Sequence, residues 1–274
     1  PAPTPLAMPP AVQQELQGIL TSAGGTFGVI VYDVTADTQV YGQDVSRRFP
    51  AASLIKLPIV LTVYQQAQQG TLSLDEQMTL QAGDIVGGTG SLQNAPVGSS
   101  YSLRDLCGRA LYDSDNTAAN MLLNRVGGLQ AVNALMDEIG AAQTRAERYL
   151  MDLAAREQNR DNWTSPADML TILRALTQGE LVGEAGAQEI LDFLGRSQDR
   201  QKIPSMLPPE AVIRHKTGVL PGVEHDVAIV DTPTGRRFIL IIMGMGLPNN
   251  QTGIDAIAQA ARLVYDYEVS IGGE

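Results

Sequence analysis

Strand-like patterns lie near the two ends of this 274-residue chain, whereas the long middle is patterned for helices. The N-terminal part begins with an amphipathic helix that a Gly-Gly pair ends, and two short β-branched segments follow it. The C-terminal part reverses this order, with a hairpin before an amphipathic helix. The first helix is expected to carry Val12, Leu16, Ile19 and Leu20; the strands are expected at 26–34, 39–41, 226–230 and 237–243, and the last helix at about 253–267.

The middle of the chain is predicted to be almost wholly helical. An apolar helix is expected from about Ser53 to Gln69, and further helices are predicted at 103–111, 118–126, 129–139, 166–176 and 187–194. The fold class that follows is α/β, of the two-lobed α+β kind. An antiparallel sheet covered by the terminal helices forms one lobe (11–52 and 203–274), and the all-α lobe (53–202) is inserted into it. We expect the active site in the cleft between the lobes.

Composition excludes several classes of function. A net charge of −11, with 19 scattered Lys and Arg, argues against nucleic acid as a partner. No apolar run reaches the roughly 20 residues of a membrane span, and no zinc-binding spacing is present. The single cysteine, Cys107, is expected in the core. Residues 1–10, with five prolines, are predicted to be an extended leader or tether.

Ser53 precedes the apolar helix and is either a helix cap or a nucleophile. Taken alone, capping is the better interpretation, because Ser is a preferred N-cap residue. Lys56 changes this, since positions i and i+3 share a helical face and an amine there can reach the hydroxyl. One Ser-x-x-Lys is expected by chance in roughly every chain of this length, so other motifs must decide.

Two further triplets occur in order along the chain: Ser114-Asp115-Asn116 and Lys216-Thr217-Gly218. The probability that both arise by chance is on the order of 10⁻³ from residue frequencies. Alone, the first triplet would be a helix cap with an Asx turn, and Asp115 is expected to brace that loop. Burial and a second ammonium nearby would lower the pKa of Lys56 toward the range of a general base.

The three motifs resemble those of class A β-lactamases and penicillin-binding proteins, over roughly residues 11–268. The resemblance implies that Ser53 is the nucleophile, with Lys56, Ser114 and Lys216 as the other catalytic residues. It implies that Asn116, Thr217, Gly218 and Val219 bind substrate. It also implies an oxyanion hole made by the backbone N–H groups of Ser53 and Val219. No cofactor and no metal is expected.

One departure from the class A pattern concerns deacylation. Class A β-lactamases carry a Glu-x-x-x-Asn about 34 residues after the second motif, on the loop that supplies the deacylating water. The corresponding position here is Leu150, and no Glu-x-x-x-Asn stands there. The pattern is therefore closest to PBP-A-type DD-peptidases, which share the class A fold and lack that glutamate. Glu147 and Asp152 remain possible substitutes.

Other departures concern the substrate carboxylate and the loop. An arginine that helps to grip the carboxylate in class A enzymes has only Glu224 or His225 as its nearest counterpart here. A Ser-His-Asp triad using His215 or His225 is a further alternative, although structural roles are more common for such histidines. Arg148 and Asp161 are either a clamp at the neck of the loop, as a similar pair is in class A enzymes, or two solvated charges.

The resulting hypothesis is a penicillin-binding serine D-Ala-D-Ala peptidase that acts on peptidoglycan stem peptides and is acylated by β-lactams. One alternative is a β-lactamase that uses Glu147 or Asp152. A second alternative is a non-catalytic sensor domain, although a binder would not need Lys56. We expect a monomer without a transmembrane segment, and the resemblance implies an extracytoplasmic location.

Overall fold

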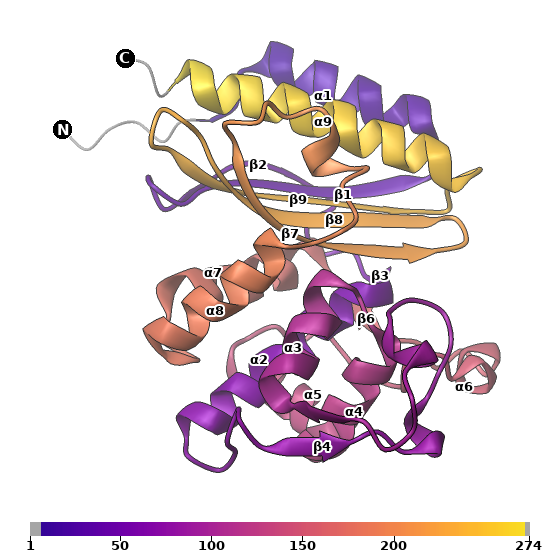
Figure 1. Cartoon of the computed structure of the whole chain (residues 1–274). Coiled ribbons are helices and arrows are strands. Elements are labelled where there is room, and N and C mark those ends of the chain that lie inside the picture. Colours follow the sequence, from indigo (N-terminus) through magenta and orange to yellow (C-terminus); the bar gives the residue numbers. More distant parts are fainter. Residues whose placement is uncertain (1–6, 272–274) are drawn as a thin grey trace.

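The fold is built on a five-stranded antiparallel sheet with strand order β2-β1-β9-β8-β7. The computed structural model describes residues 7–271. The N-terminal hairpin joins the C-terminal strands through the pairing of β1 with β9, so the two ends of the chain share one sheet (Figure 1). The strands are β1 (Thr26–Asp33), β2 (Thr38–Gln43), β7 (Val212–Leu220), β8 (Val223–Asp231) and β9 (Arg237–Met245).

Helices α1 (Pro10–Ala23) and α9 (Asn250–Ser270) cover one face of the sheet (Figure 1). Helix α9 begins where the Asn249 side chain accepts a hydrogen bond from the backbone N–H of Thr252, at 3.0 Å. Its apolar stripe, which includes Ile257 and Val264, is fully buried against the sheet and α1. The predicted antiparallel sheet with N- and C-terminal helical cover is confirmed.

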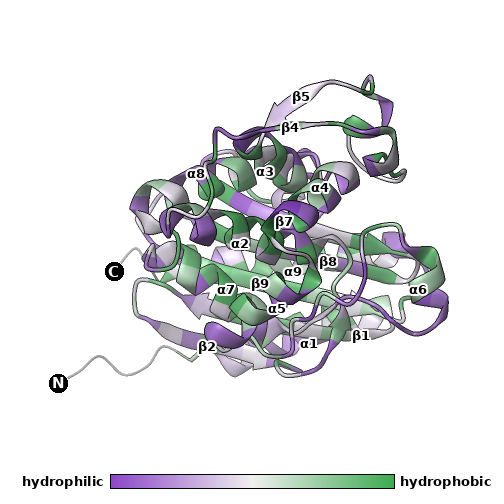
Figure 2. Cartoon of the chain, turned by 90° about the horizontal axis from the view of Figure 1, so that it is seen from below, coloured by the Kyte–Doolittle hydropathy of each residue, from purple (hydrophilic) through white to green (hydrophobic). Residues whose placement is uncertain are grey.

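The remaining helices lie on the opposite side of the sheet, grouped around α2 (Figure 1). Ten consecutive residues of α2, from Lys56 to Gln65, are buried, which explains why its sequence is apolar on nearly every side. Figure 2 shows this hydrophobic character on α2 and β9. These helices are α2 (Lys56–Gln68), α3 (Leu103–Tyr112), α4 (Asn116–Val126), α5 (Leu129–Glu138), α6 (Leu153–Glu157), α7 (Pro166–Gln178) and α8 (Gly183–Gly195).

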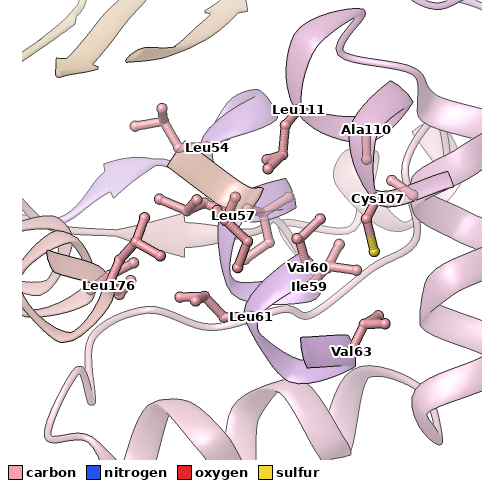
Figure 3. Packing of buried hydrophobic residues seen from close by; sticks show 14 of the residues in the cluster. Leu54, Leu57, Ile59, Val60, Leu61, Val63, Cys107, Ala110, Leu111 and Leu176 are labelled. Carbon is pink, nitrogen blue, oxygen red and sulfur yellow. The ribbon is translucent and has the colours of Figure 1, made fainter. Parts of the chain in front are cut away.

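One hydrophobic core joins the helices to the inner face of the sheet. Figure 3 shows Leu57 and Val60 of α2 in one buried cluster with Cys107, Ala110 and Leu111 of α3. Cys107 is fully buried, as its helical setting predicts. Because α2 is fixed in this core, the residues at its N-terminus are held rigidly. The division into two lobes stays a prediction.

Some local predictions need correction. Residues 1–6 of the predicted leader lie outside the described residues, but its last part belongs to the fold. Met8 is buried and its N–H donates to Val40, and Pro10 is the first residue of α1. The short strands β3 (Phe49–Pro50), β4 (Gln77–Thr79), β5 (Ser100–Ser102) and β6 (Trp163–Thr164) were not predicted, since two or three residues carry no usable periodicity.

Within residues 7–271, no helix has the length and apolar character that crossing a membrane requires.

Candidate active site

Ser53 lies in a tight 3₁₀ turn, Ala52–Ile55, that leads directly into α2. It is therefore not the N-cap residue that its sequence context suggested. The preceding Ala52 has φ of 47°, in the left-handed region that a non-glycine residue rarely adopts. The turn is held by the short hydrogen bond of 2.7 Å from the Ala51 N–H to the Asn162 carbonyl. The Ser53 hydroxyl is thus presented at a cavity of about 470 Å³.

Lys56 is completely buried, one turn after the serine, and its amine is the centre of the site. Its Nζ atom lies 3.2 Å from Ser53 Oγ and 3.1 Å from Ser114 Oγ. The Asn116 Oδ1 atom is 2.8 Å away, and the Ser114 carbonyl also accepts from the amine. The first two motifs, 58 residues apart at Lys56 and Ser114, therefore meet at one nitrogen.

The second motif forms the turn between α3 and α4. Ser114 has φ of 52°, and the Asp115 carboxylate caps α4 by accepting from the Ala118 N–H at 2.9 Å. The other oxygen of that carboxylate accepts from the Leu92 N–H at 2.7 Å, so Asp115 braces the loop as predicted. Asn116 donates to the Gly87 carbonyl at 3.0 Å. The segment at Gly87 thereby packs along the motif.

The third motif lies on β7, beside the serine turn. Lys216 Nζ is 3.0 Å from Ser114 Oγ, so this hydroxyl stands between two buried amines. Gly218 explains the close approach of strand and turn. A Cβ atom at this position would lie 3.2 Å from both the Ala51 carbonyl oxygen and Ala52 Cβ. Thr217 and Val219 line the cavity with Ser53.

Burial and a neighbouring cation lower the pKa of each of the two amines. Burial, and next the neighbouring Lys216 ammonium, lower the pKa of Lys56 well below its ordinary value. Burial, and next the ammonium of Lys202, lower the pKa of Lys216 to about 7. A lowered pKa favours the neutral amine, which is the form of Lys56 that can accept a proton.

Lys202 was missed by the sequence reasoning. Its Nζ atom is buried between the carboxylates of Asp199 and Glu224, at 3.0 Å from each. Asp199 stands only three residues before Lys202, but Glu224 is 22 residues after it, so no local motif joins the three. Glu224 is one of the two counterparts considered for the class A arginine. It pairs with Lys202, accepts from Asn250 of α9, and does not line the cavity.

The two histidines are placed away from the cavity. His215 Nδ1 lies 2.9 Å from Asp226, and His225 Nε2 lies 2.7 Å from the Pro50 carbonyl oxygen. Burial lowers the pKa of His225 to about 4. Among the described residues that line the cavity there is no histidine, so a Ser-His-Asp triad at Ser53 is contradicted.

The loop expected to carry a deacylating carboxylate presents Leu150 to the cavity. Asn120 of α4 holds this leucine in place: the Leu150 N–H donates to Asn120 Oδ1 at 2.9 Å, and Asn120 Nδ2 donates back to its carbonyl at 3.0 Å. Asn120 therefore positions Leu150, and like Lys202 it is not part of any motif. Its one sequence signal is its place one helical turn after Asn116.

The possible substitutes for the missing glutamate are used elsewhere. Asp152 caps α6 by accepting from the Ala155 N–H at 2.9 Å, and Glu147 lies 4.0 Å from Arg48. Neither lines the cavity. The predicted clamp at the neck of the loop is confirmed, because Arg148 contacts Asp161 through Nε at 2.8 Å and Nη2 at 2.7 Å, and both side chains are buried.

Comparison with known proteins places this site in a family. A profile of the β-lactamase enzyme family matches residues 11–268. β-Lactamase L2 of Stenotrophomonas maltophilia is 34% identical over 70% of this chain and 63% of its own length. β-Lactamase CTX-M-8 of Citrobacter amalonaticus is 29% identical over 93% of this chain and 88% of its own length.

Solved structures agree with the sequence relatives. A leucine-to-glutamate variant of PBP-A, an acyl-enzyme complex with penicillin G, superposes with a TM-score of 0.88 at 28% identity, covering 97% of this chain and 99% of that one. A β-lactamase from Sphaerobacter thermophilus gives a TM-score of 0.85 at 28% identity, covering 93% and 96%. The chain therefore belongs to the β-lactamase enzyme family and is a serine hydrolase of the class A β-lactamase superfamily.

Proposed function

We propose that this chain is a penicillin-binding serine D-Ala-D-Ala peptidase whose Ser53 is also acylated by β-lactams. The observation that carries the proposal is Leu150: an apolar side chain lines the cavity where an efficient β-lactamase needs a carboxylate, beside an intact acylation apparatus. The PBP-A likeness, including a complex with penicillin G, supports the same choice. Its natural substrate would be a peptidoglycan stem peptide. The protein would act outside the cytoplasm, as a monomer.

Acylation follows from the amine contacts. Neutral Lys56 takes the proton of Ser53 Oγ, 3.2 Å away, as that oxygen attacks the carbonyl carbon. Backbone N–H groups of Ser53 and Val219 would stabilise the oxyanion, a contribution of about 3 kcal/mol per donor. When the C–N bond breaks, the proton passes from Lys56 through Ser114 Oγ, 3.1 Å away, to the leaving nitrogen. The products are the acyl-enzyme and a free amine.

Lys216 and Thr217 are assigned to the terminal carboxylate of the substrate. Lys216 lines the same cavity as Ser53, and its contact with Ser114 Oγ ties carboxylate binding to the proton path. An acidic protein can bind an anion here because the charge that matters is local. Asn116, which holds both Lys56 and the Gly87 carbonyl, would donate to a substrate carbonyl if its Gly87 bond opened.

The relatives named β-lactamases favour a second candidate, in which the acyl-enzyme is hydrolysed fast. The contacts of Glu147 and Asp152 argue against it, since neither lines the cavity. A non-catalytic sensor is disfavoured for a different reason. A binder would not need a buried lysine whose amine contacts a serine hydroxyl, because burying that amine is costly.

The first test is intact-protein mass spectrometry after mixing with benzylpenicillin. We expect an adduct on Ser53 that persists for hours, because water in the cavity has no carboxylate to activate it. Ser53→Ala is the matched control and should show no adduct. Rapid loss of the adduct, with hydrolysed drug in solution, would instead establish the β-lactamase candidate. Absence of an adduct on the unmodified protein would overturn the proposal.

Carboxylate binding should depend on pH through Lys216. Its pKa of about 7 means that it is protonated below pH 7 and loses its charge as the pH rises further. The dissociation constant of the non-covalent benzylpenicillin complex should therefore rise about tenfold between roughly pH 6 and pH 9, the low end of what hydrogen bonds to charged groups are worth. Acylation rates measured against benzylpenicillin concentration would give this constant.

Two comparisons test whether the pH dependence comes from the contact between Lys216 and the carboxylate. Benzylpenicillin methyl ester has no carboxylate, so its binding should hardly change over the same pH range. Lys216→Arg keeps its charge at every pH used, so the rise should disappear in this variant. A rise of the same size for the ester would mean that a different group titrates.

A further inference from the structure

The cavity extends from Ser53 to a wall made by α6 and the residues before it. Large hydrophobic side chains are rarely exposed in the described part of the chain, yet three of them line this cavity. Met151 is 39% exposed, Leu153 is 54% exposed and Val219 is 49% exposed. An exposed apolar surface that is concentrated at a cavity is a sign of ligand contact.

Two arginines of the same loop also line the cavity, and they differ in what they contact. Arg148 is buried, pairs with Asp161 through two nitrogens, and donates to the Tyr149 carbonyl at 3.1 Å. Arg156 is about one-third exposed, and its one ion pair within residues 7–271 is a longer contact of 3.4 Å from Nε to Asp161. The terminal nitrogens of Arg156 have no hydrogen-bond partner among the described residues.

The two charged residues of this wall that line the cavity are both arginines. Two guanidinium groups share the single carboxylate of Asp161. Of the acidic residues that line the rest of the cavity, Asp199 pairs with Lys202 at 3.0 Å and Asp113 accepts from the Ser91 N–H at 2.9 Å. An anion at Arg156 would meet a guanidinium whose terminal nitrogens make no hydrogen bond within residues 7–271, with donors in the geometry that suits a carboxylate.

We propose that Arg156 forms a subsite for a carboxylate at the end of a short aliphatic chain on the acyl side of the substrate. This rests on the proposed function, in which the leaving-group carboxylate goes to Lys216 and Thr217 on β7. The acyl side of the substrate would then contact the opposite wall of the cavity, made by α6 and the residues before it. Met151 and Leu153 would contact the methylene groups, and the terminal nitrogens of Arg156 would donate to the carboxylate.

The test uses two derivatives of 6-aminopenicillanic acid with equal chain length, the adipoyl and the hexanoyl amide. They differ only in a terminal carboxylate or methyl group. The measured quantity is the ratio of their second-order rates of Ser53 acylation, followed by mass spectrometry at low ionic strength. Arg156→Gln should lower the adipoyl-to-hexanoyl ratio about fivefold, as expected for one partly exposed ion pair, and Arg156→Lys should retain most of it.

Arg160→Gln is the matched control, because Arg160 lies in the same loop, carries the same charge and does not line the cavity. Its ratio should stay within about twofold of the unmodified protein, a change expected from long-range charge alone. If Arg156→Gln slows both compounds equally, the residue only supports the loop and the subsite is wrong. If neither compound nor benzylpenicillin acylates Ser53 in the unmodified protein, the proposed function itself fails.

Discussion

Acylation of Ser53 by benzylpenicillin should be slowed about 10³-fold when Lys56 is replaced with alanine, within the range that general-base catalysis contributes. The reason is the placement of the amine. Lys56 Nζ is 3.2 Å from Ser53 Oγ, and burial, followed by the Lys216 ammonium, holds its pKa well below the ordinary value. Without it, the serine hydroxyl keeps its proton. Mass spectrometry of the adduct against time gives the rate.

Two additional measurements separate this role from a structural one. Lys56→Arg retains a cation at the same site but cannot lose its proton, so it should acylate as slowly as Lys56→Ala. A small primary amine added to Lys56→Ala should restore part of the rate by entering the space left behind. Acylation of Lys56→Ala within tenfold of the unmodified rate would show that a different group takes the proton.

Much of the site could be predicted because each motif brings its own local geometry. The spacing of Ser53 and Lys56 places both on one side of a turn, whichever helix type forms it, and Asp115 caps the following helix without help from distant residues. The motifs also come from segments that are each anchored in the core. Their meeting at Lys56 is a consequence of the family fold, and the resemblance supplied it where the residues alone could not.

The residues that were missed depend on tertiary contacts without a local signal. Lys202 looks like a surface lysine in the sequence, and only the tertiary fold brings Glu224 of β8 to it. Arg156 is one charge among several in a polar stretch until α6 places it beside Asp161. The strained φ of Ala52 is equally invisible, because alanine ordinarily favours helix and nothing in its neighbours indicates the left-handed conformation.

Persistence of the acyl-enzyme should depend most on Leu150. Replacing it with glutamate is expected to speed hydrolysis of the benzylpenicillin adduct by about 10²-fold or more, the contribution of a positioned general base. The backbone at this position is already fixed by two hydrogen bonds with Asn120, so the new carboxylate would enter the cavity that Ser53 shares. The lifetime of the adduct after removal of free drug is the measurement.

Leu150→Gln is the matched variant, since it has the same shape and polarity without a base. Both substitutions remove a mostly buried leucine and should lower the free energy of unfolding by about 1–3 kcal/mol, so the loss of stability cannot by itself distinguish them. A shortened lifetime in Leu150→Glu alone would show that the missing carboxylate is what keeps the acyl group on Ser53. Equal lifetimes in the two variants would mean that the loop excludes or misplaces the water, and that slow deacylation is built into its conformation.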